Sequence, residues 1–275
     1  MFKLTGFGDE ISPDINEQVK LLVSEHIKYI DLRGYEDKNI VTWTDSDMQI
    51  VKDAIDKSGL KVSCIASPIG KVRIIDDFES ELEKLDKAIK LSKFFRTRYI
   101  RIFTYYPPEN EKIENYRKEV IKRIKELVSV AKKNDIVLLV ENEGGVYCDI
   151  PSRCKDLLDT INSPNLRFLY DPGNFSHIGI KPFEEAYNVL RRYIEYVHVK
   201  DSKLNSPIFV PAGEGDVNYD AIFLNLDKSK FNGFVSLEPH LSASGKFNGC
   251  TGPELYLKAI SSLKSILTKL SINYC

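Results

Sequence analysis

Four polar residues lie at the ends of successive apolar segments in the second half of the chain. They are Glu141, Asp171, His198 and Glu238, and each follows mostly apolar residues, where an unpaired charge is costly to bury. Three carboxylates brought together repel one another unless a cation lies between them. With one imidazole they form a donor set for a single divalent ion. We therefore predict one bound Mn²⁺, Co²⁺, Mg²⁺ or Fe²⁺, and Zn²⁺ is also compatible with these ligands.

Side-chain alternation along the strands supports the convergence of these residues. If Glu141 points inward, Leu139 shares its face, because neighbouring residues of a strand point to opposite sides. By the same rule Lys200 shares the face of His198. Taken singly, each residue has a simpler interpretation: a carboxylate after a strand is often solvated or caps a helix, and a lone histidine is often a core residue. The joint pattern at four strand ends favours the metal site.

The elements that position these residues alternate between two hydrophobic periods. Short runs rich in β-branched and aromatic residues are typical of strands buried on both faces of a parallel sheet. We predict such strands at 4–8, 29–34, 61–67, 98–105, 136–142, 167–171, 196–201 and 234–240. Amphipathic helices are predicted at 14–26, 44–58, 77–95, 111–134, 151–162, 182–193, 218–227 and 253–270.

Eight strand–helix pairs in strict alternation predict the α/β class and a (β/α)8 TIM barrel, with residues 1–275 as a single domain. The alternative is an open doubly wound sheet. That fold needs a glycine-rich phosphate loop after its first strand, and the segment GFGDEIS does not supply one. In a barrel, catalytic residues gather at the carboxyl ends of the strands, where the four polar residues lie.

Composition excludes several classes of partner. The chain of 275 residues balances 39 Lys and Arg against 40 Asp and Glu, so its formal net charge is -1. Such a chain has no global field that attracts nucleic acid or an anionic membrane. No apolar run approaches the roughly 20 residues of a membrane-spanning helix. Asp9 and Glu10 interrupt the start of the chain too early for a signal peptide, so we predict a cytoplasmic protein. A homo-oligomer is expected on general grounds.

The cysteines form no CxxC pair and no spacing typical of a zinc site. An odd number of widely spaced cysteines predicts reduced thiols, with Cys64 in the core. A bridge between Cys148 and Cys154 is the alternative. The remaining two are Cys250 and Cys275.

Six motifs resemble those of the xylose-isomerase-like barrel family of sugar phosphate isomerases and epimerases. They span nearly the whole chain and read GFGDEIS, LLVENEGG, LYDPGN, VHVKD, GEGDVNY and SLEPH. The resemblance implies that Glu141, Asp171, His198 and Glu238 are the metal ligands. In the family's ketose epimerases the two glutamates also act as the acid–base pair.

This resemblance suggests proton transfer next to a carbonyl of a small carbohydrate substrate, a sugar, sugar phosphate or keto-polyol. The cation would hold neighbouring substrate oxygens and stabilise an enediolate, while Glu141 and Glu238 remove and return the proton. A metal-dependent dehydratase of a keto-inositol or keto-sugar, like the inosose dehydratases, is the alternative on the same scaffold. A second alternative is a barrel that binds sugars without catalysing a reaction. An endonuclease for abasic DNA, also of this superfamily, is disfavoured because its metal cluster needs many histidines and this chain has 4.

Five further residues are candidates for substrate binding: Glu10, Lys71, Arg101, Asn174 and Lys200. Lys71 and Arg101 near strand ends could receive an anionic group, and each cation could instead pair with a neighbouring acid. Asn174 stands where the family's sugar epimerases often carry a histidine that contacts substrate. The arginine usual after the seventh strand is not evident, and Lys203 is the nearest basic residue. Both departures leave the particular sugar open.

Overall fold

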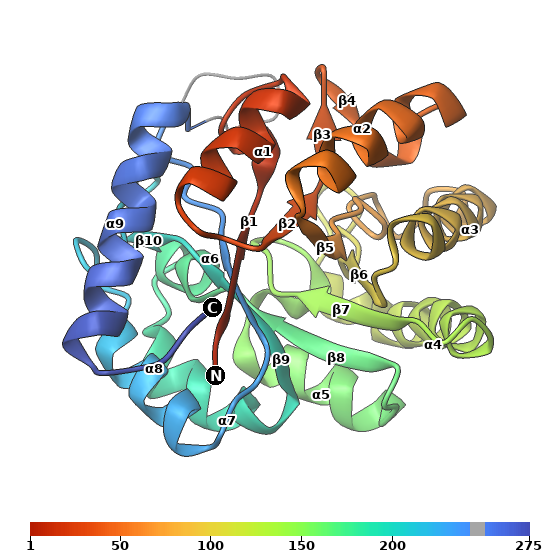
Figure 1. The fold of residues 1–275 in the computed structure, drawn as a ribbon. Helices are drawn as coiled ribbons and strands as arrows, with labels where there is room; N and C mark the ends of the chain where they lie inside the picture. The colour runs from red at the N-terminus through yellow and green to blue at the C-terminus, as the bar shows by residue number, and fades with distance from the viewer. Residues whose placement is uncertain (243–250) are drawn as a thin grey trace.

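Eight parallel strands form a barrel in the computed structural model, which describes residues 1–242 and 251–275. The strands pair in the order β1-β12-β9-β8-β7-β6-β5-β2. A parallel bridge between Phe7 and Asp31 joins the two ends of this sheet, and helices surround it (Figure 1). This arrangement confirms the predicted (β/α)8 barrel. The strands are β1 (Lys3–Gly6), β2 (Tyr29–Leu32), β5 (Lys61–Ile65), β6 (Tyr99–Ile102), β7 (Val137–Glu141), β8 (Leu166–Tyr170), β9 (Ile194–Val199) and β12 (Phe234–Leu237).

Most of the predicted helices alternate with these strands. Apolar residues at helical spacing bury one face of each against the barrel. Thr44 and Asp47 form a capping box at the start of α2, because each side chain accepts a hydrogen bond from the other's backbone N–H. The helices are α1 (Ile15–Ser24), α2 (Asp45–Ser58), α3 (Phe78–Phe95), α4 (Arg117–Lys133), α5 (Pro151–Ile161), α8 (Tyr219–Lys228) and α9 (Pro253–Lys269).

The segment 182–193 differs from the single α-helix predicted there. It consists of the π-helix η5 (Pro182–Tyr187), one α-helical turn, α7 (Asn188–Leu190), and the 3-10 turn η6 (Arg191–Tyr193). The buried Tyr170 hydroxyl donates to the Pro182 carbonyl at 2.7 Å, which ties the first turn to the end of β8. This tertiary contact is not visible in the hydrophobic period.

Short elements after the strands were also not predicted. Helix α6 (Pro172–His177) follows β8 directly. Two hairpins lie in the loops, β3 (Gly34–Tyr35) with β4 (Lys38–Asn39), and β10 (Asp201–Ser202) with β11 (Phe209–Val210). Strands of two residues are too short to show a period.

The barrel interior follows the predicted alternation of β7. Val137 and Leu139 pack inside the barrel with Cys64, Leu169 and Tyr196. Leu138 and Val140 belong to the separate core between the sheet and the helices. The side chain of Glu141 continues the inward series at the carboxyl end.

The cysteines in the described residues are free, so the Cys148–Cys154 bridge is not formed. The Cys154 thiol instead approaches the Cys148 carbonyl at 3.4 Å. Cys64 is buried, as predicted, and Cys250 lies outside the described residues. Within the same residues no helix is both long and apolar enough to cross a membrane.

A buried carboxylate, Asp31, links four strands across the barrel interior. Its Oδ1 accepts the hydroxyls of Ser63 and Tyr196, each at 2.5 Å, and its Oδ2 accepts that of Ser236. Burial raises the pKa of Asp31, although the three hydroxyl donors oppose this shift. The network therefore supplies polar cross-links between β2, β5, β9 and β12 without an ion pair.

We predict that Asp31→Ala lowers the free energy of unfolding by about 3 kcal/mol, because the Tyr196 and Ser236 hydroxyls lose their buried acceptor. Asp31→Asn keeps one acceptor oxygen and should cost less. Urea denaturation followed by circular dichroism measures both changes. Equal stability of Asp31→Ala and the wild type would contradict the role of this network.

Candidate metal centre

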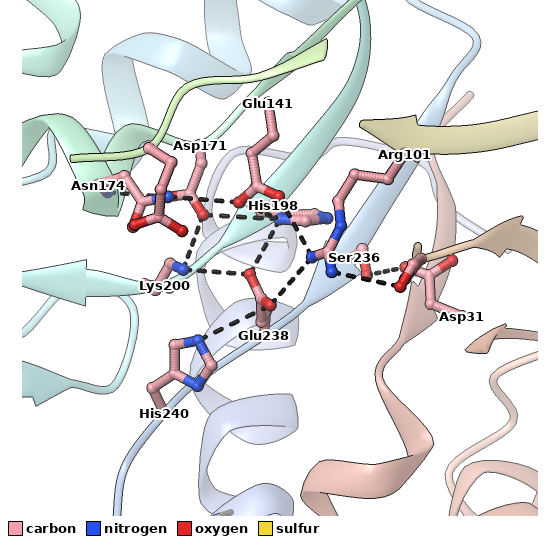
Figure 2. A network of polar contacts seen from close by, with 12 residues as sticks. Asp31, Arg101, Glu141, Asp171, Asn174, His198, Lys200, Ser236, Glu238 and His240 are labelled. Carbon is pink, nitrogen blue, oxygen red and sulfur yellow. Dashed lines mark hydrogen bonds and ion pairs between the residues drawn. The ribbon is translucent and has the colours of Figure 1, made fainter. Parts of the chain in front are cut away.

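Glu141, Asp171, His198 and Glu238 meet at one point at the carboxyl end of the barrel (Figure 2). The His198 Nδ1 lies 3.3 Å from Glu141 Oε1, 3.5 Å from Asp171 Oδ2 and 3.0 Å from Glu238 Oε2. All four side chains are buried. The predicted convergence of these residues is therefore present in the structure.

Neighbouring strands of the barrel, β7, β8, β9 and β12, supply these residues. Glu141 is the last residue of β7, and His198 lies in β9 opposite Ser236 of β12. Asp171 directly follows β8 and caps helix α6, because its Oδ1 accepts the backbone N–H of Asn174 at 2.9 Å. This cap fixes one carboxylate oxygen and leaves Oδ2 directed at the cluster.

The Asn142 side chain fixes the backbone at Asp171. Its amide donates to the Asp171 carbonyl at 2.8 Å and accepts the Asp171 N–H at 2.9 Å. Neighbouring loops after β7 and β8 are thereby held together, which sets the spacing of Glu141 and Asp171.

The cluster fits a divalent ion. Among the described residues, His198 Nδ1 is buried without a hydrogen-bond partner. Ligand atoms at about 2.0–2.2 Å from one ion, at tetrahedral or octahedral angles, lie roughly 3.0–3.5 Å apart. The distances from His198 Nδ1 to the three carboxylates, 3.0–3.5 Å, match this spacing. Three carboxylates and one imidazole are also suitable donors for such an ion.

Electrostatics in the cluster favour charged forms. Burial by itself lowers the pKa of His198, but the Glu141 and Glu238 carboxylates raise it well above its usual range. Burial by itself raises the pKa of Glu238, but Lys200 and His198 hold it well below its usual range. Burial by itself also raises the pKa of Asp171, but Lys200 brings it below its usual value. In the metal-free protein, a proton on His198 is therefore stabilised by the ionised carboxylates.

Two further cations contact the carboxylates. Lys200 Nζ lies 2.9 Å from Asp171 Oδ2 and 3.1 Å from Glu238 Oε2. Arg101 Nη1 lies 3.2 Å from Glu141 Oε2 and 3.5 Å from Glu238 Oε1. Burial lowers the pKa of Lys200, but Asp171 and Glu238 raise it above its ordinary value, so the ammonium stays charged.

A cavity of about 720 Å³ opens above the cluster. It has room for a small ligand. Charged, polar and aromatic side chains contribute to its wall, among them Arg33, Lys71, Arg101, Phe103, Glu141, Asn174, Lys200, Phe209, Glu238 and His240.

The predicted substrate-binding residues differ in their placement. Arg101 and Lys200 line the cavity, and so does Asn174, whose amide donates to Glu141 Oε1 at 3.3 Å. Lys71 also lines it and pairs with Glu143 at 2.8 Å. Glu10 is fully buried and is not part of the cavity wall.

Arg33 and His240 were not predicted, yet both line the cavity. Arg33 Nη1 lies 3.1 Å from Glu238 Oε1, and its Nε lies 2.7 Å from Asp9 Oδ2. Arg33 directly follows β2. Glu141 was identified as the polar residue that ends an apolar strand, and the same criterion could have identified Arg33. Lys203 instead pairs with Asp216 at 3.0 Å and is exposed.

Fold and site together define a (β/α)8 barrel with a buried carboxylate–histidine cluster that can hold a metal ion. The chain belongs to the xylose isomerase-like TIM barrel family, whose family model matches residues 22–266.

Two relatives of the chain are dehydratases. The 3-dehydroshikimate dehydratase of Bacillus anthracis is 25% identical over 215 residues, which cover 71% of this chain and 73% of that protein. The inosose dehydratase of Clostridium perfringens is 22% identical over 141 residues, 44% of this chain and 46% of that protein.

Solved structures with the same fold include an epimerase-like protein, an epimerase and a protein with a bound zinc atom. A D-tagatose 3-epimerase-like protein has a TM-score of 0.79 at 15% identity, with 98% of each chain covered. The 3-keto-D-glucoside 4-epimerase of E. coli has a TM-score of 0.71 at 16% identity, with 98% of this chain and 100% of that chain covered. The IOLI protein with a bound zinc atom has a TM-score of 0.73 at 17% identity, with 98% of each chain covered. At these identities the likeness shows the fold.

We predict about one divalent ion per chain after incubation with Mn²⁺, Co²⁺, Mg²⁺ or Zn²⁺, and its loss in Asp171→Ala, because one ligand and its charge are removed. Elemental mass spectrometry of the dialysed protein measures the content. Asp216→Ala, which removes a loop carboxylate outside the cluster, is the control and should keep the ion. A metal-free wild type would show that the four residues do not act as ligands.

Metal affinity should depend on pH through His198. The raised pKa of His198 means that its proton competes with the ion at pH values above the ordinary histidine pKa of about 6.5. The lowered pKa values of Asp171 and Glu238 keep those carboxylates ionised over the same range. We therefore expect the dissociation constant to rise about tenfold for each unit by which pH falls below the pKa of His198, with one proton released on binding. Isothermal titration calorimetry in buffers of different ionisation enthalpy measures both, and a pH-independent affinity would contradict this assignment.

Proposed function

We propose that this protein is a divalent-metal-dependent isomerase or epimerase that transfers a proton next to a carbonyl of a sugar, sugar phosphate or keto-polyol. The orientation of the two glutamates carries the proposal. Glu141 and Glu238 each direct one oxygen toward His198 Nδ1 and the other toward Arg101. Each glutamate therefore has one oxygen for an ion and a second oxygen that can take a proton.

The chain's own residues supply the acid–base chemistry. Glu141 and Glu238 come from β7 and from the end of β12, so that one can remove a proton and the other return it. Arg101 contacts the outer oxygens of both and places a guanidinium charge beside them. A bound divalent ion supplies Lewis-acid stabilisation of the charge that develops on a substrate oxygen.

Lys200 and Asn174 are proposed to orient the substrate. Both line the cavity and both contact a carboxylate of the cluster. The buried Lys200 ammonium can donate to a substrate oxygen while it stays within reach of Asp171. The partner is then a small carbohydrate. Cytoplasmic localisation and a homo-oligomer stay predictions.

A metal-dependent dehydratase of a keto-inositol or keto-sugar is the second candidate. It is supported by the 3-dehydroshikimate dehydratase, which shares 25% identity with the chain across 73% of that protein's length. Such a reaction uses the same removal of a proton next to a carbonyl and then expels a hydroxyl from the adjacent carbon. The two candidates differ in whether the proton is returned or water is lost.

We predict that Glu238→Gln lowers turnover by about 10²–10⁴-fold, because the amide cannot accept the proton. The assay uses the metal-loaded protein in D₂O with D-tagatose, D-fructose, a 3-keto-D-glucoside, a keto-inositol and 3-dehydroshikimate. Mass spectrometry then reads deuterium at the carbon next to the carbonyl, or loss of water.

The matched control is Glu195→Gln, a glutamate in β9 that accepts the Tyr99 hydroxyl and does not line the cavity. It should keep wild-type turnover. An active Glu238→Gln variant would remove Glu238 from the acid–base pair. Deuterium in the recovered or rearranged sugar supports the epimerase or isomerase, whereas a dehydrated product supports the second candidate.

A further inference from the structure

His240 has an unusual backbone conformation next to the metal centre. It lies two residues after Glu238 and has a φ of 49°, in the left-handed region that few non-glycine residues adopt. Such conformations cost free energy and persist only where surrounding contacts enforce them. The contacts that enforce this one involve Glu10.

Glu10 holds both the backbone and the ring of His240. Its Oε2 accepts the His240 N–H at 2.9 Å and the Thr251 hydroxyl at 2.5 Å. Its Oε1 lies 3.0 Å from His240 Nδ1. Glu10 Oε1 and His240 Nδ1 are both buried, and neither has a hydrogen bond to any other described residue. A proton on Nδ1 would therefore face the Glu10 carboxylate. The Phe209 ring, with its centroid 5.6 Å from that of His240, packs against the same side chain.

This arrangement leaves the other ring nitrogen of His240 for the cavity (Figure 2). Nε2 lies 3.7 Å from Glu238 Oε1, too far for a direct hydrogen bond. The same Glu238 oxygen lies 3.1 Å from Arg33 Nη1. His240 and Arg33 therefore flank the outer oxygen of a proposed acid–base residue.

We propose that His240, positioned by Glu10, forms with Arg33 a subsite that binds a hydroxyl group of the substrate beside Glu238. A hydroxyl both donates and accepts, so it can pair with Nε2 and with the guanidinium at once. This inference rests on the proposed function and narrows its substrate to a carbonyl compound with a neutral hydroxyl on the Glu238 side. Glu10, which the sequence suggested as a substrate contact, is then a positioning residue.

A second metal ion between Glu10, His240 and Glu238 is the competing interpretation, since their ligand atoms lie within 4.8 Å of one another. The Arg33 guanidinium argues against it. Its Nη2 lies 3.7 Å from Glu10 Oε1, and its Nη1 contacts Glu238. The positive charge of the guanidinium therefore already offsets the negative charge of these two carboxylates.

The first test reads the tautomer of His240 by ¹⁵N NMR of the histidine rings, which is tractable because the chain has 4 histidines. His240→Asn assigns the signal. In the wild type we expect a proton on Nδ1, facing Glu10. In Glu10→Gln the amide oxygen should keep the His240 N–H and Thr251 contacts, so that its NH₂ donates to Nδ1 and moves the ring proton to Nε2.

A wild-type Nδ1 without a proton, or a tautomer that Glu10→Gln leaves unchanged, would overturn the positioning role. Glu81→Gln is the matched control, because Glu81 is another buried glutamate that accepts a backbone N–H, that of Gly70 at 2.6 Å, and is not part of the cavity wall. It should leave the His240 signal unchanged. This arm needs no substrate, so it decides the positioning of His240 even if none of the assayed compounds reacts.

The second test measures kcat and KM of His240→Asn on whichever of the five assayed compounds the wild type converts. Asparagine tolerates the left-handed conformation and is too short to replace Nε2. We expect KM to rise about tenfold, the effect of one lost hydrogen bond, with metal content unchanged. Glu10→Gln should raise KM in the same direction.

An unchanged KM in His240→Asn would overturn the hydroxyl subsite. So would two ions per wild-type chain with one lost in His240→Asn, since His240 would then be a metal ligand. Failure of the proposed function has a different signature: the metal-loaded wild type converts none of the five compounds, while the NMR result for His240 is unaffected.

Discussion

The repulsion between three buried carboxylates is the constraint on which the site depends. Glu141, Asp171 and Glu238 approach one imidazole nitrogen with their side chains buried, where like charges repel more strongly than in water. Lys200 and Arg101 offset part of this charge from two sides. A divalent ion among the four ligand atoms would offset the remaining negative charge.

The barrel supplies the rigidity that holds such a cluster. Asp171 is fixed from both ends, by the Asn142 side chain at its backbone and by its cap on α6 at its carboxylate. Below the site, Asp31 joins strands across the interior through hydroxyl groups. These contacts hold the strand ends and the Asp171 side chain in place through the protein itself.

The fold and the ligand set could be predicted because both depend on local patterns. Strands buried on both faces read as continuous apolar runs, so the polar residue that ends each run is conspicuous, as with Glu141 after 136–140. The irregular helix at 182–193 could not be predicted, since the Tyr170 contact with Pro182 joins residues whose relation appears only after folding. Arg33 also follows an apolar strand, as the four cluster residues do, but the sequence does not indicate which carboxylate it contacts.

The sequence by itself determined that the chain folds as a barrel and that four polar residues lie at the ends of strands β7, β8, β9 and β12. It did so because hydrophobic period and side-chain alternation are properties of neighbouring residues. Only the tertiary structure decided that Glu10 faces His240 rather than the cavity, and that Arg101 contacts both glutamates. The first contact joins residues more than two hundred positions apart in the sequence. The second joins Arg101 of β6 to Glu141 of the neighbouring strand β7 and to Glu238 after β12. Their partners are set by packing and barrel closure, which no local pattern encodes.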